Sequence, residues 1–436
     1  MVLANEAATY YHADRDLIVA SHVDDLYIDS AKADIEWFLT KLTTRFKCKA
    51  PEWLTPGSLI DLLGLVIHMV IEPDLGGRVI YLSMERYIVT MVSHLGLTVS
   101  DFKARNVPIS KPVHCDCHQG EGGTCSRCYL REEVSEKDHQ WFQRAVGSVN
   151  WLVTTLRYDC ALAVNRISKY TAHATVGSLA AIIYLIEYLW TTKSLCLRVL
   201  VDAAYAGPMF SYYVDSEHGG DRVRESRLCA TASFACFHGE TLFAWRVGRT
   251  DMAFATKLIG QAHADTSSAA AETYAAGQAT QSILGLSYVA DEINLTMPLP
   301  MELRLDATAA LAFMSSTATR SKMRHIDLRS EWVTILRGKR IFTGKYCPSE
   351  ALFADLGTKI QGPQKFGPLR DGMYFSHALP STPIVQSASV ARAPAMRSTG
   401  SGSGLGGGWL VDLRIQTVGV QMGNAPAEKA ISSAPP

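Results

Sequence analysis

Acidic residues spread through the second half of the chain could together hold metal ions. The candidates are Asp202, Glu272, Asp306 and Asp355. Carboxylate oxygens are the ligands that Mg²⁺ and Mn²⁺ favour in proteins. Two such ions about 3.5–4 Å apart can hydrolyse a phosphodiester, because one activates a water molecule and the other stabilises the leaving 3′ oxygen. If the fold brings these four residues together, their carboxylates could therefore hold divalent metal ions.

Each of the four also has a structural explanation, such as closing a strand, lying on a solvated helix face or capping the next helix. The order of the four residues along the chain, relative to the expected strands and helices, favours a shared metal site over these separate explanations. The fourth position has a second candidate, Asp327, which lies in the string of residues 325–329. That string precedes the last predicted strand and Asp355 follows it, so Asp355 is preferred.

A further pair of carboxylates lies near the start of the chain, in His22-Val23-Asp24-Asp25. Short apolar runs flank this string, which predicts a β-hairpin with two adjacent acidic residues at its tip. Neighbouring carboxylates repel each other unless a cation neutralises them, so the pair suggests a divalent metal. A polar turn with a chance Asp-Asp is the alternative.

Four cysteines between residues 112 and 137 have the spacing of a structural zinc site. They are Cys115, Cys117, Cys125 and Cys128. His114 or His118 could replace one of them as a ligand, and a glycine-rich loop would let the chain turn back. The alternative is a surface insertion with clustered thiols. If zinc binds here, its binding free energy would fold an otherwise loose loop.

Alternating strands and helices are expected in the second half of the chain. The predicted strands are residues 197–201, 228–237, 241–245, 301–305 and 340–346, with a hairpin turn at 238–240. Helices are expected around Glu272, after Asp306 and around Asp355. This order resembles that of the ribonuclease H fold, which implies a mixed five-stranded sheet with helices packed on it.

The first half predicts a smaller α+β unit followed by helices. After the Asp pair we expect an amphipathic helix at 34–46, strands at 62–71 and 78–82, and a helix at 84–95. Apolar residues recur at helical spacing within 34–46. Residues 138–192 are expected to be all-helical. Beyond residue 375 the chain is rich in Ser, Pro, Gly and Ala, which predicts disorder.

From Leu17 to about Gly367 the chain resembles the C-terminal part of a copia-type retrotransposon polyprotein. His22-Val23-Asp24-Asp25 stands where that family has Tyr-Val-Asp-Asp. Residues 201–207 resemble its Ser-Asp-Ala-Asp-Trp-Ala-Gly. The other matching strings are residues 62–67, 81–88, 142–151, 157–159, 267–274, 305–306, 324–329 and 354–359.

The resemblance implies a multidomain protein of the α/β and α+β classes. The implied domains are a partial reverse-transcriptase palm at 1–111, a Cys-rich insertion at 112–137, a helical thumb or connection at 138–194, an RNase H-like domain at 195–370 and a disordered tail at 371–436. It further implies an Asp-Glu-Asp-Asp set for two-metal cleavage, with Asp24 and Asp25 as the polymerase metal pair.

Departures from the family limit the expected activities. The third polymerase carboxylate lies on an earlier palm strand that this chain does not contain, so polymerisation by this chain alone is expected to be incomplete. Ala204 stands where the family has a second Asp, and the stretch Pro208–Arg222 is longer than its pattern. We expect an enzyme that cuts the RNA strand of an RNA–DNA hybrid. The alternative is a decayed nucleic-acid-binding or structural remnant of a transposable element.

The amino-acid composition limits the expected binding partners and location of the protein. The 436 residues include 42 Lys plus Arg and 42 Asp plus Glu, a neutral balance that predicts weak non-specific binding to nucleic acid. The start of the chain shows no signal peptide, and the apolar stretch Leu179–Trp190 is too short to cross a bilayer. We expect an intracellular protein of the cytoplasm or nucleus with reduced cysteines and no membrane partner. Its expected partners are an RNA–DNA hybrid and upstream parts of the polyprotein.

Overall fold

A computed structural model describes residues 1–6, 8–110, 128–202, 210–217, 230–250, 268–315, 328–380 and 417–421. Cys115, Cys117, Cys125 and Asp327 lie outside these residues, as does the side chain of Cys128. The predicted zinc site and the second candidate for the fourth acidic position therefore stay predictions.

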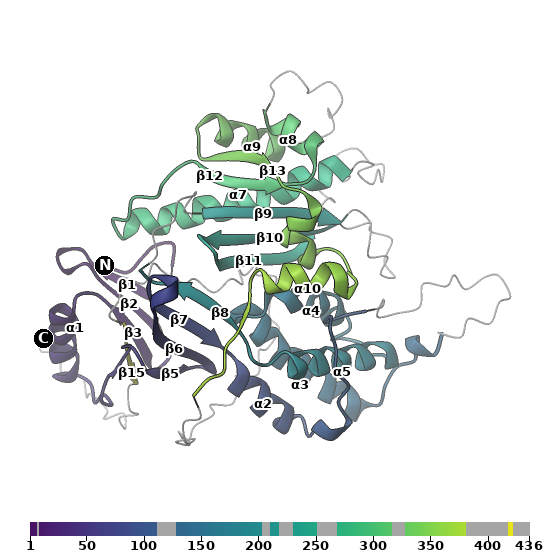
Figure 1. Cartoon of the computed structure of the whole chain (residues 1–436), viewed down its shortest axis with the longest axis horizontal. Coiled ribbons are helices and arrows are strands. Elements are labelled where there is room, and N and C mark those ends of the chain that lie inside the picture. The colour runs from purple at the N-terminus through teal and green to yellow at the C-terminus, as the bar shows by residue number, and fades with distance from the viewer. Residues whose placement is uncertain are drawn as a thin grey trace, which may run out of the picture.

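The described residues form a mixed α/β structure with three five-stranded sheets, as expected for an α/β multidomain chain (Figure 1). The first sheet has the order β1-β2-β3-β15-β4. Its strands are β1 (Thr9–His12), β2 (Leu17–His22), β3 (Asp25–Asp29), β4 (Glu52–Trp53) and β15 (Thr417–Gln421). Helix α1 (Lys32–Thr43) buries Ile35 against Val19 and Ile28 of this sheet.

The predicted hairpin at the Asp pair is present. β2 and β3 are antiparallel, with Ile18 opposite Asp29 and His22 opposite Asp25. Val23 and Asp24 form the turn, and Val23 has a left-handed backbone with φ 53°. Apolar residues alternate toward α1 along both strands, so the hairpin register is fixed by burial of one face.

The second sheet has the order β14-β8-β7-β6-β5. Its strands are β5 (Leu59–Leu62), β6 (Leu65–Glu72), β7 (Gly77–Ser83), β8 (Leu195–Leu200) and β14 (Phe375–Ser376). β8 pairs antiparallel with β7, with Leu200 opposite Val79. Residues 195–200 therefore extend this sheet, although we had assigned them to the domain at 195–370 and had expected a strand at 197–201 to open it.

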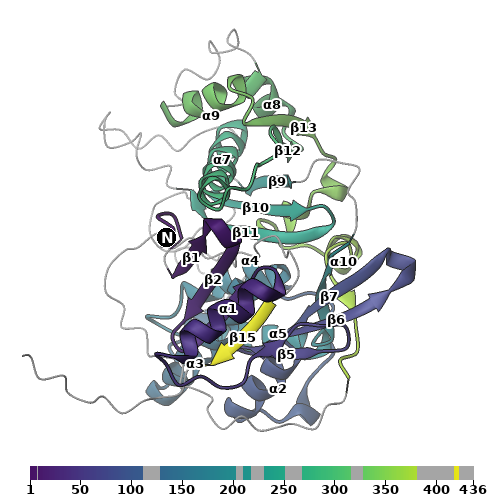
Figure 2. The ribbon, with the colours of Figure 1, turned by 90° about the vertical axis from the view of Figure 1, so that its left-hand side faces the viewer.

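The third sheet has the order β11-β10-β9-β12-β13 (Figure 2). Its strands are β9 (Phe210–Glu217), β10 (Ala230–His238), β11 (Thr241–Thr250), β12 (Met301–Leu305) and β13 (Phe342–Tyr346). β9, β10 and β11 are antiparallel neighbours, whereas β12 runs parallel to both β9 and β13. This is the mixed five-stranded sheet that we predicted, but its first strand, β9, lies within the stretch that exceeds the family pattern.

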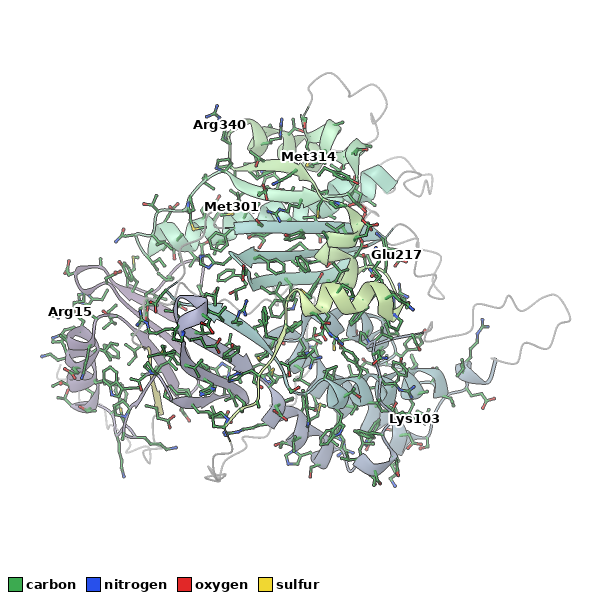
Figure 3. The ribbon with its side chains drawn as sticks, viewed as in Figure 1. Arg15, Lys103, Glu217, Met301, Met314 and Arg340 are labelled. Carbon is green, nitrogen blue, oxygen red and sulfur yellow. The ribbon has the colours of Figure 1, made fainter. Side chains whose placement is uncertain are left out.

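Both faces of the third sheet are covered. On one face α7 (Ser268–Glu292), α8 (Thr308–Ser315) and α9 (Leu328–Gly338) enclose a core that includes Val214 of β9, and Met301 and Met314 are buried in it (Figure 3). Tyr213, the neighbour of Val214, belongs to the core on the opposite face. β9 is therefore buried along almost its whole length, as strands covered on both faces are.

Further helices contribute to the core shared by the second and third sheets. They are α2 (Glu85–His94), α3 (Glu136–Thr155), α4 (Ala161–Ser168), α5 (Val176–Thr191) and α10 (Pro363–Asp371). α3, α4 and α5 occupy the region that we predicted to be all-helical. Arg166 of α4 forms an ion pair at 2.9 Å with Glu217, which lies at the end of β9 and is labelled in Figure 3.

A buried ion pair fixes the connection between α3 and α4. The Arg157 guanidinium donates to both carboxylate oxygens of Asp159, at 2.9 and 2.8 Å, and Tyr188 donates to the same carboxylate at 2.7 Å. Arg157 also donates to the hydroxyl and the backbone carbonyl of Thr192. Both charged groups are fully buried, and each has hydrogen-bond partners, which such groups require.

Two short strands are described within the segment 371–436, for which we predicted disorder. β14 pairs with β8, and β15 pairs with both β3 and β4. Residues 381–416 and 422–436 lie outside the described residues. In the described part of the chain, no helix is both long enough and apolar enough to cross a membrane.

Candidate metal site

Three carboxylates meet at one edge of the third sheet. Asp215, Glu272 and Asp306 each place one oxygen within 4.8 Å of the other two. Asp215 is near the end of β9, Glu272 lies in the first turns of α7, and Asp306 directly follows β12. β9 and β12 are parallel neighbours, with Tyr213 opposite Arg304, so continuing this register by two residues places Asp306 beside Asp215.

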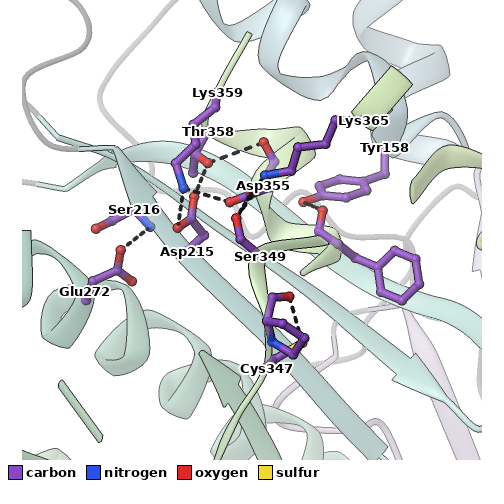
Figure 4. Close-up of polar contacts among 12 residues, drawn as sticks. Tyr158, Asp215, Ser216, Glu272, Cys347, Ser349, Asp355, Thr358, Lys359 and Lys365 are labelled. Atoms are coloured by element: carbon purple, nitrogen blue, oxygen red, sulfur yellow. Dashed lines mark hydrogen bonds and ion pairs between the residues drawn. The ribbon is translucent and has the colours of Figure 1, made fainter. Parts of the chain in front are cut away.

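Glu272 has one satisfied and one unsatisfied oxygen. Its Oε1 accepts a hydrogen bond from the Ser216 backbone N–H at 3.2 Å (Figure 4). Its Oε2 is buried and has no hydrogen-bond partner among the described residues, and the side chain is only 5% exposed. Burial, followed by the charges of Asp215 and Asp306, raises the pKa of Glu272 to about 9. A divalent cation would supply the missing partner and would favour the ionised form, so these three residues fit a metal of the Mg²⁺ class.

Two consecutive residues donate hydrogen bonds to the Asp215 carboxylate. The Thr358 hydroxyl donates to its Oδ2, and the Lys359 ammonium donates to its Oδ1 at 3.1 Å. The carboxylate is fully buried. Burial raises the pKa of Asp215 to about 7 despite the opposing effect of Lys359, and the nearby Asp355 charge raises it as well.

Asp355 lies next to this group on the far side of Lys359. Lys359 donates to its Oδ1 at 2.8 Å, and Lys365 donates to its Oδ2 at 2.5 Å (Figure 4). The Ser349 hydroxyl also donates to Oδ2, at 3.0 Å. Burial alone would raise the pKa of Asp355, but the hydrogen bonds and charges of the two lysines lower it below its usual value.

Asp355, which we predicted as the fourth metal ligand, lies beside the three-carboxylate group and is not part of it. It sits in a short 3-10 turn, Phe353–Gly357, and not in the expected helix. This turn packs closely against the third sheet at Gly357. A Cβ atom at Gly357 would overlap Ser233 of β10 and Val247 of β11, so only glycine fits without a shift of the backbone.

Asp202 is not part of the site. It follows β8, where its carboxylate accepts hydrogen bonds from three groups of Arg78: the backbone N–H at 2.9 Å, Nε at 2.9 Å and Nη2 at 2.5 Å. These hydrogen bonds lower the pKa of Asp202 to about 2. Because β8 belongs to the second sheet, the structure separates Asp202 from Glu272 and Asp306, and our placement of it among the metal ligands is corrected.

Asp215 takes the place that we had given to Asp202. The signal for it was present in the sequence, because Tyr212, Tyr213 and Val214 are aromatic or β-branched and end in an acidic residue. The family string quoted above also has two acidic residues spaced two apart. Asp215 and Glu217 have this spacing, whereas Asp202 is followed by Ala204.

The Asp24 and Asp25 pair lies at the tip of the β2–β3 hairpin. Asp24 is exposed and Asp25 is half-buried. Within the described ranges, no third Asp, Glu, His or Cys joins them in a group that could hold a metal ion. Their role as a polymerase metal pair stays a prediction.

The fold and the site define a mixed α/β chain with a carboxylate group suited to a divalent cation. Among known proteins it is similar to the Saccharomyces cerevisiae protein described as "Putative transposon Ty5-1 protein YCL074W", with 25% identity over 219 residues. The match covers 49% of this chain and 61% of that protein, so it spans about three-fifths of the relative's length. This similarity relates the chain to a transposon protein. No family model and no solved structure matches it.

Proposed function

We propose that the chain is a fragment of a copia-type retrotransposon polyprotein that cuts the RNA strand of RNA–DNA hybrids with the help of Mg²⁺ or Mn²⁺. The observation that supports this most strongly is the meeting of Asp215, Glu272 and Asp306, with a buried Glu272 oxygen that lacks a partner in the described structure. The similarity to a transposon protein agrees with such an origin.

The sheet topology also supports an RNase H-like domain. Taking β9 to β13 as strands one to five, the spatial order is 3-2-1-4-5, with the second strand antiparallel to the first and the fourth parallel to it. This is the strand order of the ribonuclease H fold that the sequence resembles. In this frame the first acidic residue belongs on the first strand, where Asp215 lies, and the third follows the fourth strand, where Asp306 lies.

The roles of the residues follow from their contacts. Asp215, Glu272 and Asp306 would hold the metal, which supplies water activation and stabilisation of the leaving oxygen. The Ser216 N–H orients Glu272, and the Thr358 hydroxyl orients Asp215. Holding ligands in place before substrate arrives lowers the cost of reorganisation during the reaction.

Polymerase activity is not proposed for this chain alone. Asp24 and Asp25 would act only together with a third carboxylate, and none joins them among the described residues. No observation on the described residues favours the alternative of a decayed remnant, which keeps the fold without catalysis. A cleavage assay distinguishes directly between an active nuclease and a decayed remnant.

The test is cleavage of an end-labelled RNA strand, paired with DNA, by the purified full chain in Mg²⁺ or Mn²⁺. Asp215→Asn should reduce cleavage by more than about 100-fold, the upper end of what loss of a mere outer-shell partner costs. Asp202→Asn is the matched control and should retain cleavage, because its carboxylate contacts Arg78 outside the site.

Absence of cleavage by the unmodified chain with either metal would reject the nuclease function and favour the decayed remnant. Cleavage that survives Asp215→Asn but is lost in Asp202→Asn would return the chemistry to the position that the sequence string suggested.

A further inference from the structure

Lys359 stands between two buried carboxylates that belong to different parts of the site. Its ammonium lies 3.1 Å from Asp215 Oδ1 and 2.8 Å from Asp355 Oδ1. Both carboxylates are 0% exposed, whereas the Lys359 side chain is 37% exposed. The ammonium therefore enters the acidic site from the solvent side, on a flexible stem.

Asp215 is shared between two possible cation positions. On one side it meets Glu272 and Asp306, where Glu272 Oε2 lacks a partner among the described residues. On the other side it meets Asp355 only through Lys359 (Figure 4). The first position lacks a positive charge from the described residues, and the second contains one.

We propose that Lys359 is a tethered cation that occupies the second metal position, so that a second metal ion binds between Asp215 and Asp355 only by displacing it. This inference rests on the proposed metal-dependent function and adds a control of metal occupancy to it. One ion would bind readily at Asp215, Glu272 and Asp306, and the second would bind more weakly because it must break two ion pairs.

Displacement is feasible because neither carboxylate would be left without partners. Asp355 Oδ2 keeps Lys365 and Ser349, and Asp215 Oδ2 keeps Thr358. Each would lose only the Oδ1 contact that an incoming cation replaces. Lys359 itself would move into solvent, where its charge is hydrated.

Mn²⁺ binding to the full chain at constant pH tests the proposal, with stoichiometry and affinity measured by calorimetry or by the spectroscopic signal of free Mn²⁺. The unmodified chain should bind one ion tightly and a second weakly. Lys359→Gln removes the competing charge, so the second ion should bind at least about tenfold tighter, a modest demand for removing a unit charge at such short range.

Lys345→Met is the matched control for loss of a positive charge. Lys345 lies on β13 of the same sheet and pairs with Glu302 at 3.2 Å, outside the acidic group. It should leave both affinities unchanged. Equal stoichiometry and affinity in Lys359→Gln and in the unmodified chain would overturn the proposal.

A second measurement needs no variant of Lys359. Acetylation by acetic anhydride, which transfers one acetyl group to a lysine amine and releases acetate, is read by mass spectrometry. It should increase at Lys359 when Mn²⁺ saturates the site and should stay constant at Lys345. Unchanged labelling of Lys359 at saturating Mn²⁺ would overturn the proposal even if the variants failed to fold.

Failure of the proposed function gives a different result. If Asp306→Asn leaves all Mn²⁺ binding unchanged, the three carboxylates hold no metal, and both the function and the role of Lys359 fall. If Asp306→Asn abolishes the tight ion but Lys359→Gln changes nothing, the metal site stands and only the tethered-cation inference fails.

Discussion

The Ser216 backbone N–H donates to Glu272 Oε1 at 3.2 Å, which joins strand β9 directly to helix α7. Ser216 follows Asp215, so this single hydrogen bond sets the position of one acidic side chain relative to another. The contact is between a rigid strand and a rigid helix, which favours a site that is formed before any ligand binds.

The raised pKa values of Glu272 and Asp215 predict that the metal-free chain loses stability as pH rises. A carboxyl whose pKa is higher in the folded state holds its proton more tightly when folded, so this stabilisation is complete below the unfolded pKa and is lost as pH rises through the folded pKa. With folded pKa values of about 9 for Glu272 and about 7 for Asp215, the loss falls between about pH 5 and 9.

Urea unfolding at pH 5.5, 7 and 9 in a chelator should show this decline, by more than the about 1.4 kcal/mol that one pKa unit represents. Saturating Mg²⁺ should remove it, because the metal favours the ionised carboxylates. Glu272→Gln should flatten the profile in the chelator. A stability that instead rises from pH 5.5 to 9 would contradict the assignment.

Breaking the buried pair of Arg157 and Asp159 should be strongly destabilising. Arg157→Met leaves the Asp159 charge without its cation in a fully buried place, and such a loss costs about 3–5 kcal/mol. Arg15→Met removes a pair with Asp34 that is only partly buried, and it should cost about 1 kcal/mol or less. Urea unfolding curves measure the loss of unfolding free energy in both variants. Similar losses would contradict the expectation that the buried pair contributes more to stability.

The close fit at Gly357 predicts a loss of activity from one methyl group. Gly357→Ala should push the 3-10 turn away from Ser233 and Val247, at a cost of about 1–3 kcal/mol in stability. Displacement of Asp355 and Lys359 with the turn should lower hybrid cleavage by about tenfold or more, since a 1 Å misplacement can cost 100-fold. Gly147→Ala, in α3 with open space around it, should cause neither effect.

The hairpin carboxylates should have no part in hybrid cleavage. The double variant Asp24→Asn, Asp25→Asn should cut hybrids at the rate of the unmodified chain, because the pair lies on the first sheet and the acidic group lies on the third. Primer extension on an RNA template should be absent from the unmodified chain. Nucleotide incorporation that depends on Asp25 would show that the pair finds its missing partner.

The cysteine spacing predicts one bound zinc ion per chain. Cys125→Ser with Cys128→Ser should lower the zinc content of the purified protein to near zero, because two of four ligands are lost. Elemental analysis measures this directly. Cys236→Ser is the control, since Cys236 is buried in the third sheet. A zinc content that stays the same in the double variant would exclude the site.

Glu272 and Asp306 could be predicted because local patterns mark their elements clearly. Asp306 ends a strand whose residues alternate between buried and half-buried, and Glu272 follows a clear helix start. Asp215 could not be found in this way. β9 is buried on both faces, so it shows no alternation, and the competing string at Asp202 matched the family pattern more visibly.

The pairing of β8 also depended on information that is not local. Leu195–Leu200 reads as an ordinary apolar strand, and no property of these residues distinguishes the free edge of β7 from the edge of the third sheet. Tertiary context decides such choices, as it does for strand propensity in general. The same holds for Lys359, whose role is visible only once Asp215 and Asp355 are placed on either side of it.

The chain leaves the second sheet to form the third sheet and its helices, and it rejoins the second sheet at a neighbouring strand. The chain departs after β8 and returns as β14, which lies antiparallel to β8 with Phe375 opposite Cys196. The chain therefore returns to the same strand that it left, at the beginning of that strand. The stretch also shares its core with the preceding helices, because the Trp245 indole N–H donates to the Val153 carbonyl at 3.0 Å and the Tyr374 hydroxyl donates to the Leu156 carbonyl at 2.7 Å. Removing the stretch would therefore expose apolar side chains of the helical region, so the two parts should unfold together.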